Sequence, residues 1–207
     1  MVRSLAALDS LVSQQQTAMV SYYKMVRTGA RLPENNEFDM NRLRIDSTIN
    51  PFNVHEEIQF AALSLDGRGV PWYGDYSLTL RDNMIGMRAS VFEENPFRFL
   101  DKHPISPTES VPQGYRASWQ RRGELAMAKL HPRIREGMTG EDFNGVLLEQ
   151  GEKSADSDFV EVHIYGAIHA RAIERVIGPE PRLRPDRIIW KRVKRELTKL
   201  GAQVEEV

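Results

Sequence analysis

A carboxylate and an imidazole stand two residues apart in the segment DSDFVEVHIYGAIHARAIERVI, residues 156–177, where Glu161 and His163 interrupt a run of strand-forming residues. Successive side chains of a strand point to opposite faces, so we expect these two side chains to project together. A carboxylate in such a position can act as a general base or stabilise positive charge that develops at a sugar carbon. An imidazole there can orient a substrate hydroxyl or act as an acid.

Both residues also have an interpretation without chemistry. Glu161 fits a solvent-facing position on a half-exposed strand, and His163 fits a partner that pairs with Glu161 across one pleat. His169, at the start of the following segment, is expected at the surface. Zinc ligation by the two histidines with a carboxylate would be expected in a spacing such as HExxH, which the segment lacks. We therefore expect no metal.

A second group of candidate residues surrounds a glycine in the sequence WYGDYSLTL. Trp72, Tyr73 and Tyr76 could stack on a planar ring, and the glycine would let a ligand approach the backbone. The alternative is an aromatic core beside a turn. The hydroxyls of Ser77 and Thr79 alternate along the same expected strand and either bind a ligand or face water.

A third group lies in the sequence RASVF. Arg88 and Ser90 share a strand face with Phe92, because they stand at alternate positions. A guanidinium there can hold a phosphate or pair with a carboxylate. The alternative for Arg88 is a surface salt bridge.

Composition narrows the function classes. The chain has 207 residues, a net charge of −1 and no cysteine. Cysteine nucleophiles, thiolate metal sites and disulfides are therefore excluded, and no overall basic field points to nucleic acid. No apolar run approaches the length of a membrane span, and no signal peptide precedes the first helix. We expect a cytoplasmic protein, or a toxin domain that a secretion system delivers.

Hydrophobic periodicity predicts the elements that position these residues. We expect helices over residues 4–27, 54–65, 119–130, 167–177 and 188–200, and a short helical turn at 96–100. We expect strands at residues 42–49, 73–81, 84–92, 143–149 and 159–165. Residues 101–114 contain three prolines without periodicity, which indicates a long surface loop that could cover a site. The basic face of the last helix fits a solvated surface or a phosphate contact.

This pattern predicts an α+β fold, in which a helical N-terminal part precedes a mixed, mainly antiparallel β-core with flanking helices. We expect one domain over residues 1–207, with residues 1–65 mainly helical and residues 70–207 forming the β-rich core with its C-terminal helix.

The order of the motifs YGDYSLTL, RASVFEEN and DFVEVHIYGAI resembles bacterial domains related to the ADP-ribosyltransferase-like toxins, over about residues 70–178. The resemblance implies a β-core that binds NAD as a substrate, with Glu161 as the catalytic residue. It also implies that Tyr73, Ser77 and Thr79 line the nicotinamide side, and that Arg44, or else Arg42, meets the phosphates. The second acidic or amide residue of these toxins is replaced by Phe159.

The sequence thus leads to three hypotheses. The first is an enzyme that cleaves the nicotinamide–ribose bond of NAD, with an unknown protein or nucleic-acid acceptor and a cognate immunity or antitoxin protein as partners. The second is a nuclease that uses Glu161, His163, His169 and the basic last helix. The third is a non-catalytic interaction module with a degenerate cleft. No membrane partner is expected.

Overall fold

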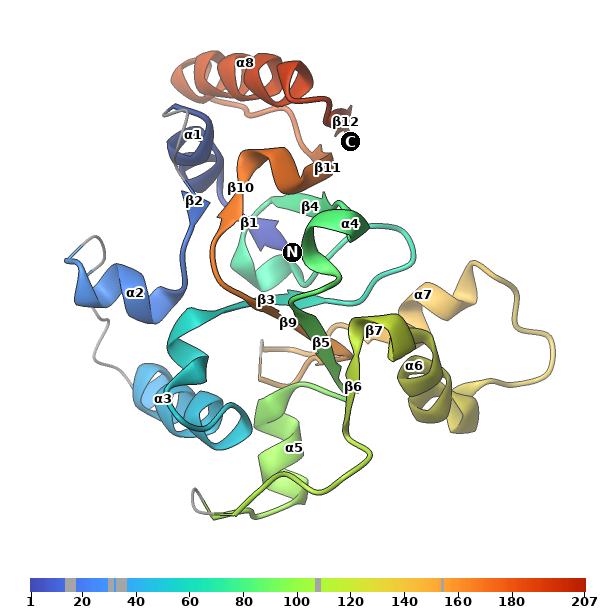
Figure 1. Ribbon diagram of the computed structural model, residues 1–207. Coiled ribbons are helices and arrows are strands. Elements are labelled where there is room, and N and C mark those ends of the chain that lie inside the picture. The colour runs from blue at the N-terminus through green and yellow to red at the C-terminus, as the bar shows by residue number, and fades with distance from the viewer. Residues whose placement is uncertain (14–17, 30–31, 33–36, 107–108, 154) are drawn as a thin grey trace.

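The computed structural model describes the chain except residues 14–17, 30–31, 33–36, 107–108 and 154. The fold is α+β. Within the described residues, two four-stranded sheets lie near the middle of the molecule, and helices surround them (Figure 1). Nearly every strand pair is antiparallel, as the sequence predicts.

The first sheet has the order β1-β4-β11-β12 and consists of β1 (Val2–Arg3), β4 (Tyr76–Leu80), β11 (Ile173–Gly178) and β12 (Gln203–Glu206). β11 and β12 are parallel, because α8 (Arg184–Lys199) connects them as a crossover. The other pairs in this sheet are antiparallel.

The second sheet has the order β3-β9-β5-β6 and consists of β3 (Ile58–Ala62), β9 (Glu161–Tyr165), β5 (Ala89–Phe92) and β6 (Arg116–Ser118). All its pairs are antiparallel. Their register aligns Phe60, His163, Ser90 and Ser118 in one row across the four strands. Two short ladders complete the pairing, β2 (Ala18–Met19) with β10 (Ile168–His169) and β7 (Leu148–Glu149) with β8 (Asp158–Phe159).

The helices divide between the two sheets. α1 (Leu5–Ser13) and α8 pack on each other beside the first sheet. α2 (Tyr22–Arg27), α3 (Glu37–Ile49) and α5 (Pro96–Lys102) lie around the second, and α4 (Asp82–Ile85), α6 (Arg122–Leu130) and α7 (Asp142–Leu147) complete the fold. Local signals explain several helix starts, since Ser21 caps α2 and Asn95 caps α5 just before Pro96.

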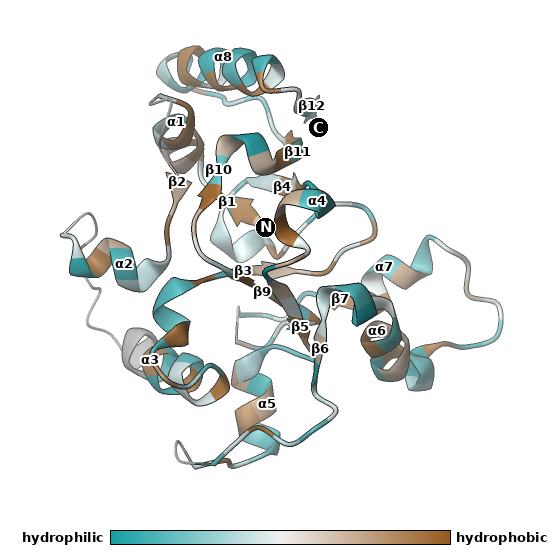
Figure 2. Cartoon of the chain, in the orientation of Figure 1, coloured by the Kyte–Doolittle hydropathy of each residue, from teal (hydrophilic) through white to brown (hydrophobic). Residues whose placement is uncertain are grey.

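Two apolar clusters hold these layers together. The larger one lies under α1, α6 and α8 and includes Leu8, Leu78, Val162 and Trp190. The smaller one joins α3 and α5 to the second sheet through Ile45, Ile49, Phe92 and Phe99. Figure 2 shows the consequence for α8, which alternates apolar and polar residues along its turns because only one face meets the core.

Several sequence expectations are confirmed. Strands form within residues 73–81 and 159–165, and helices form within residues 96–100, 119–130 and 188–200. Residues 4–27 are only partly helical, since α1 and α2 are separated in the chain by β2. Of residues 84–92, the first two end α4 and only the last four form β5.

Four predictions of element type are wrong. Residues 42–49 form the end of α3, because their apparent alternation also places Ile45 and Ile49 one helical turn apart. Residues 143–149 form α7 and the short β7. Residues 54–65 form a 3₁₀ turn (Val54–Glu57) followed by β3, and residues 167–177 form β10, a 3₁₀ turn (Ala170–Ala172) and β11. In the last two cases pairing with neighbouring strands outweighs the apolar periodicity of a short segment. The predicted mainly helical part, residues 1–65, therefore contains β1, β2 and β3 as well as helices.

In the described part of the chain, no helix is both long enough and apolar enough to cross a membrane.

The core contact of α8 gives a test of the fold. Trp190 is fully buried, its ring lies 4.6 Å from that of Tyr76, and its indole N–H donates to Glu206. Trp190→Ala should lower the free energy of unfolding by about 3–5 kcal/mol, because it removes a large side chain from a packed core. Ile188→Ala on the exposed side of the same helix is the control and should change this energy by no more than about 0.5 kcal/mol in urea denaturation. Equal effects of the two substitutions would contradict this packing.

Candidate functional site

One face of the second sheet gathers the polar side chains that the sequence analysis singled out. Strand alternation places Glu161, His163 and Tyr165 of β9 on this face. It places Arg88, Ser90 and Phe92 on the same side of the adjacent strand, because Ser90 pairs with His163 and Phe92 with Glu161. Arg116 of β6 pairs with Phe92 and extends the face to the edge of the sheet. α3 and α5 cover part of this face through the smaller apolar cluster.

Glu161 and His163 form a hydrogen-bonded pair. His163 Nε2 lies 2.7 Å from Glu161 Oε1. The exposed fractions are 9% for Glu161 and 1% for His163, so the glutamate does not occupy the solvent-facing position that one interpretation gave it. Burial raises the pKa of Glu161 to about 8 against the attraction of Arg42 and Arg116. Burial also lowers the pKa of His163 to about 3, helped by the charge of Arg116.

The other ring nitrogen of His163 meets two further residues. Nδ1 lies 3.1 Å from Asn50 Oδ1 and 3.1 Å from Arg116 Nη1. The same guanidinium donates to Ser90 Oγ, to the carbonyl of Ile49 and to Asn50 Oδ1, at 3.2, 3.0 and 3.1 Å. Arg116 therefore ties the end of α3 to β5 and β9 while its side chain keeps one exposed edge.

A third layer of polar groups comes from α2 and α3. Tyr23 donates to Asp46 Oδ2 at 2.7 Å, and Arg42 Nε donates to the same oxygen at 3.3 Å. Burial raises the pKa of Asp46, as does the nearby charge of Glu161, so the two carboxyls act on each other. The guanidinium of Arg42 also lies over the ring of Phe60 at 5.7 Å, next to His163 in the sheet.

Aromatic rings enclose the imidazole. The ring of Phe60 meets that of His163 edge-on at 5.2 Å, and the ring of Phe92 stacks on it at 6.0 Å. Together with the 1% exposure of His163, these contacts show a ring packed away from water. The hydrogen bonds to Glu161 and to Asn50 or Arg116 then fix its orientation.

Of the residues assigned to NAD, Ser90 lies next to His163 and accepts from Arg116. Arg88 shares this face, but its guanidinium donates to the backbone carbonyls of Tyr165 and Met84. Arg88 therefore links the end of β9 to α4. This contact differs from both the phosphate contact and the surface salt bridge of the sequence analysis.

The residues near the YGD motif lie on the other sheet or at its start. Ser77 and Thr79 belong to β4, where Ser77 Oγ accepts from the backbone N–H of Gly69. Tyr76 packs against Trp190 in the core, as the aromatic-core alternative expects. Tyr73 is exposed in the 3₁₀ turn Pro71–Tyr73, and its phenol interacts electrostatically with Arg42.

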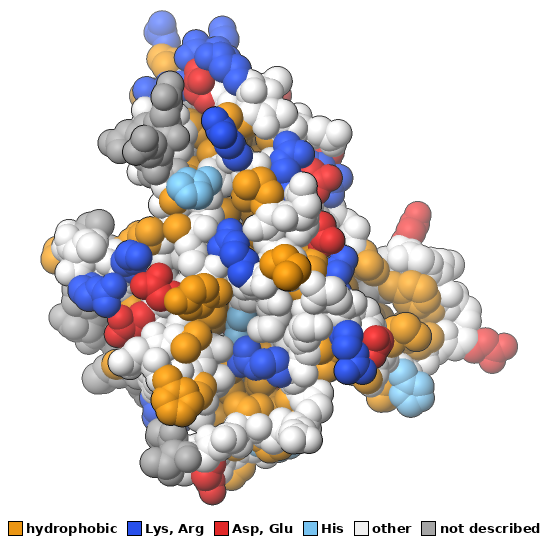
Figure 3. All heavy atoms as spheres, viewed as in Figure 1, with side chains coloured by type: hydrophobic (Ala, Val, Ile, Leu, Met, Phe, Trp, Pro, Cys, Tyr) orange, Lys and Arg blue, Asp and Glu red, His pale blue; other side chains and the backbone are white. Residues whose placement is uncertain are grey.

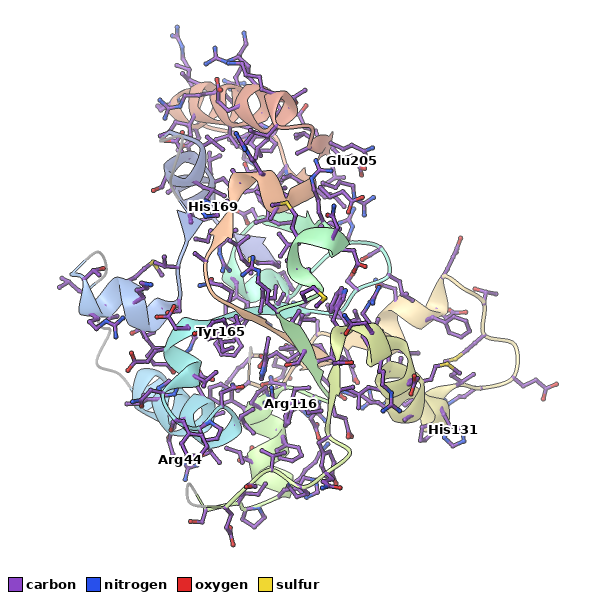
Figure 4. The ribbon with its side chains drawn as sticks, viewed as in Figure 1. Arg44, Arg116, His131, Tyr165, His169 and Glu205 are labelled. Atoms are coloured by element: carbon purple, nitrogen blue, oxygen red, sulfur yellow. The ribbon has the colours of Figure 1, made fainter. Side chains whose placement is uncertain are left out.

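Arg44 occupies a different surface from Glu161. It lines a pocket of about 450 Å³ together with Thr48, Leu100, Pro104, Ile105, Ser106 and Glu109. Arg42 stands two positions earlier in α3, on the side that meets Asp46. Figure 4 shows Arg44 on α3 and Arg116 on β6, closer to the middle of the molecule. Arg42, the second choice for a phosphate-binding arginine, is therefore the one beside the Glu161–His163 pair.

The position two residues before Glu161 contributes no polar group. Phe159 is buried in the core. The neighbouring Asp158 is bound by Lys129 at 2.5 Å and by Arg133. Although burial opposes ionisation, these hydrogen bonds and charges hold the pKa of Asp158 below its ordinary value. This buried ion pair ties α6 to β8 and leaves Glu161 without an acidic companion on its own strand.

The remaining sequence candidates are dispersed. Within the described residues, no three histidine, aspartate or glutamate side chains are placed to hold a metal ion. His169 is exposed on β10. Figure 3 shows basic side chains gathered over α8, where Arg192 pairs with Asp9, and Lys194 with Glu206.

Sequence reasoning missed Arg116, Asn50, Asp46 and Tyr23. One signal was available for Arg116, since the tripeptide Arg-Ala-Ser occurs at residues 88–90 and again at 116–118. The two copies lie on paired antiparallel strands. Asp46 carried no such signal, because residues 42–49 had the appearance of a strand, and Asn50 stood at the break that follows them.

Comparison with known proteins gives no relative. No protein-family model matches the chain, and neither a curated protein nor a solved structure matches it.

The pKa of Glu161 makes stability depend on pH. Between pH 4.5 and about 8 the folded chain keeps a proton on Glu161 that the unfolded chain releases, so the free energy of unfolding falls as pH rises. His163 acts in the opposite direction below pH 6.5, where only the unfolded chain binds a proton on the ring. The buried N-terminal amine of Met1, whose pKa burial lowers to about 5, also opposes Glu161 up to pH 8, so only the difference between the wild type and a variant without the Glu161 carboxyl isolates Glu161.

Glu161→Gln removes this titration. From pH 6.5 to 8.5, the wild type should lose about 1–2 kcal/mol of unfolding free energy relative to this variant. Urea denaturation at several pH values measures the difference. The control is Glu174→Gln at an exposed glutamate of β11, whose curve should run parallel to that of the wild type. A parallel curve for Glu161→Gln would show that Glu161 ionises as readily in the folded chain as in the unfolded one.

Proposed function

We propose that the protein cleaves the nicotinamide–ribose bond of NAD, with Glu161 as the catalytic residue. The observation that carries the proposal is the environment of Glu161. Its carboxyl is removed from water except at one edge, where 12% of the side chain is exposed, and Arg42 and Arg116 act on its charge.

The charges of this site complement those of NAD. The nicotinamide ring is cationic and the pyrophosphate is anionic. A carboxyl held mainly neutral by burial gains a strong partner when a cationic ring approaches its open edge, because charges interact more strongly away from water. Arg116 has an exposed edge on the same sheet face and can receive a phosphate oxygen. The resemblance of the strand motifs to ADP-ribosyltransferase-like toxins supports the same ligand.

In the proposed reaction, the bond between the ribose carbon and the ring nitrogen breaks, and its electron pair stays on the departing nicotinamide. The sugar becomes an oxocarbenium-like cation. Ionised Glu161 stabilises this cation, and a nucleophile then attacks the sugar carbon and loses its proton. One preorganised charge of this kind contributes about 3–4 kcal/mol to lowering the barrier.

His163 supports Glu161 as a positioning residue. Its 2.7 Å hydrogen bond fixes one carboxyl oxygen and leaves Oε2 without a partner among the described residues. The imidazole is itself fixed by Phe60, Phe92 and the groups at Nδ1. The carboxyl therefore needs little rearrangement when the sugar cation forms.

The surroundings of Glu161 favour water as the nucleophile. Phe159 is apolar and buried, and Asp158 is held by Lys129 and Arg133, so neither can orient an acceptor side chain. We therefore place NAD hydrolysis before transfer to a protein or a nucleic acid. Hydrolysis of NAD would harm the producing cell, which gives such an activity reason to have an inhibitory partner protein.

The first test measures nicotinamide release from NAD by the purified protein. Glu161→Gln should slow release by about 10²–10³-fold, because the amide cannot carry the negative charge. Glu174→Gln should keep the wild-type rate. Absence of release from the wild type, together with absence of NAD binding, would remove the proposal. RNA and DNA incubated with divalent metals in parallel test the nuclease hypothesis.

The second test uses pH. The catalytic form has Glu161 ionised, so release should rise about tenfold per pH unit below the pKa of about 8 and level off above it. Arg116 favours the ionised carboxylate, so Arg116→Gln should move this profile to higher pH, whereas Arg116→Lys, which keeps the charge, should move it less. A profile that is flat from pH 6 to 9, or one that Arg116→Gln moves to lower pH, would contradict the role of this pair.

A further inference from the structure

The contacts at His163 Nδ1 cannot all be hydrogen bonds at one time. Asn50 Oδ1 is an acceptor and Arg116 Nη1 is a donor, and both lie 3.1 Å from this nitrogen. A neutral imidazole nitrogen either carries a proton and donates, or lacks one and accepts. A ring protonated at Nδ1 therefore donates to Asn50, and a ring without that proton accepts from Arg116.

The amide of Asn50 has a fixed orientation in this arrangement. Its Oδ1 also accepts from Arg116 Nη2 at 3.1 Å, and a guanidinium can only donate. Turning the amide over would place its NH₂ group against the guanidinium. Arg116 therefore fixes Oδ1 of Asn50 as the acceptor beside Nδ1. The proton of the neutral imidazole can still lie on either Nδ1 or Nε2.

The opposite ring nitrogen transmits this choice to Glu161. His163 Nε2 and Glu161 Oε1, 2.7 Å apart, share one proton. If Nδ1 carries the proton of the neutral ring, Nε2 is an acceptor and Glu161 must be the protonated acid that donates to it. If Nε2 carries the proton, ionised Glu161 accepts it and Nδ1 is free to accept from Arg116.

We propose that Glu161, His163, Asn50 and Arg116 form a two-state proton switch, in which ionisation of Glu161 exchanges the tautomer of His163. In the first state Glu161 Oε1–H donates to Nε2, and Nδ1–H donates to Asn50. In the second state Nε2–H donates to ionised Glu161, and Arg116 donates to Nδ1. Going from the first state to the second, the Oε1 proton moves to Nε2 and the Nδ1 proton leaves for solvent, so one proton is released and the ring stays neutral.

The surroundings keep the imidazole neutral in both states. Burial opposes a charged ring, and so does Arg116 of β6, whereas Asp46 favours one; Phe60 and Phe92 pack against the ring. The other ionisable groups around the pair are Arg42 and Asp46 of α3 and Tyr23 of α2, of which Arg42 favours ionised Glu161 and Asp46 opposes it. The switch therefore titrates at the carboxyl, while the ring only changes the position of its proton.

The switch gives Asn50 and Arg116 opposite roles as positioning residues. Asn50 stabilises the protonated state of Glu161, and Arg116 stabilises the ionised state. Their contribution to catalysis rests on the proposed function. The switch itself is a property of the unliganded protein, so it can be tested without NAD.

Nitrogen-15 NMR of the histidine-labelled protein distinguishes a ring nitrogen that carries a proton from one that does not. The chain has five histidines, and comparison with His163→Gln identifies the signals of His163. We expect Nδ1 to be the protonated nitrogen at pH 6 and Nε2 to be the protonated nitrogen at pH 10. The midpoint of this exchange should equal the midpoint of Glu161 ionisation, which the chemical shift of its carboxyl carbon reports. One tautomer throughout this range, or a ring protonated on both nitrogens at pH 6, would overturn the proposal.

Substitutions at Asn50 and Arg116 should shift the pH midpoint of the tautomer exchange, which a purely structural role of these residues would leave unchanged. Asn50→Ala should lower the midpoint by roughly half to one pH unit, and Arg116→Gln should raise it by at least as much, because one loses the acceptor and the other the cationic donor. Glu161→Gln should abolish the exchange. Ser118→Ala, at an exposed residue on the strand of Arg116, should leave the midpoint unchanged.

Arg116→Gln alone decides the matter if Asn50→Ala fails to fold, since the side chain of Arg116 reaches the surface. An unchanged or lowered midpoint in that variant would overturn the switch. Loss of nicotinamide release with an intact tautomer exchange would count against the proposed function only. Release of nicotinamide without any exchange would count against the switch only.

Discussion

The hydrogen bond between Glu161 and His163 lies where both partners have lost nearly all contact with water. A charge in such a place is costly unless it is paired, and the surrounding residues can be understood from that constraint. Arg42 and Arg116 offset the charge of an ionised carboxyl, whereas Asp46 opposes it. Asn50 and Arg116 occupy the far side of the ring, so every polar atom of the imidazole has a partner. The smaller apolar cluster, which holds α3 against the second sheet, is what brings Asn50 and Asp46 into range.

Part of this arrangement could be read from the sequence because it depends on local periodicity. The common face of Glu161 and His163 follows from strand alternation alone, and so does that of Arg88, Ser90 and Phe92. The α+β class follows from the mixture of alternating and helical patterns. The last helix could be placed because its apolar residues recur over four turns, which a short segment cannot imitate.

The rest depends on contacts between distant parts of the chain. Residues 58–62 form a strand because β9 lies beside them, about 100 positions later, and nothing within the segment itself states this. Asn50 and His163 are 113 positions apart. The mistaken prediction of a strand at residues 42–49 hid α3, the helix that ends just before Asn50 and carries it to His163. The choice between Arg44 and Arg42 depends on the same segment. On a strand the two residues would share a face, but on α3 they point to different neighbours.

Arg116 lies on β6, a three-residue strand at the edge of the second sheet. Short edge strands open more often than central ones, since only one neighbour holds them. Each opening of β6 would carry the guanidinium away from His163 while β9 stays in place between β3 and β5. The acid strength of a buried glutamate would then fluctuate with the fraying of a peripheral strand. Amide hydrogen exchange at β6 and the ionisation of Glu161 would then both report the same equilibrium, the local opening of β6.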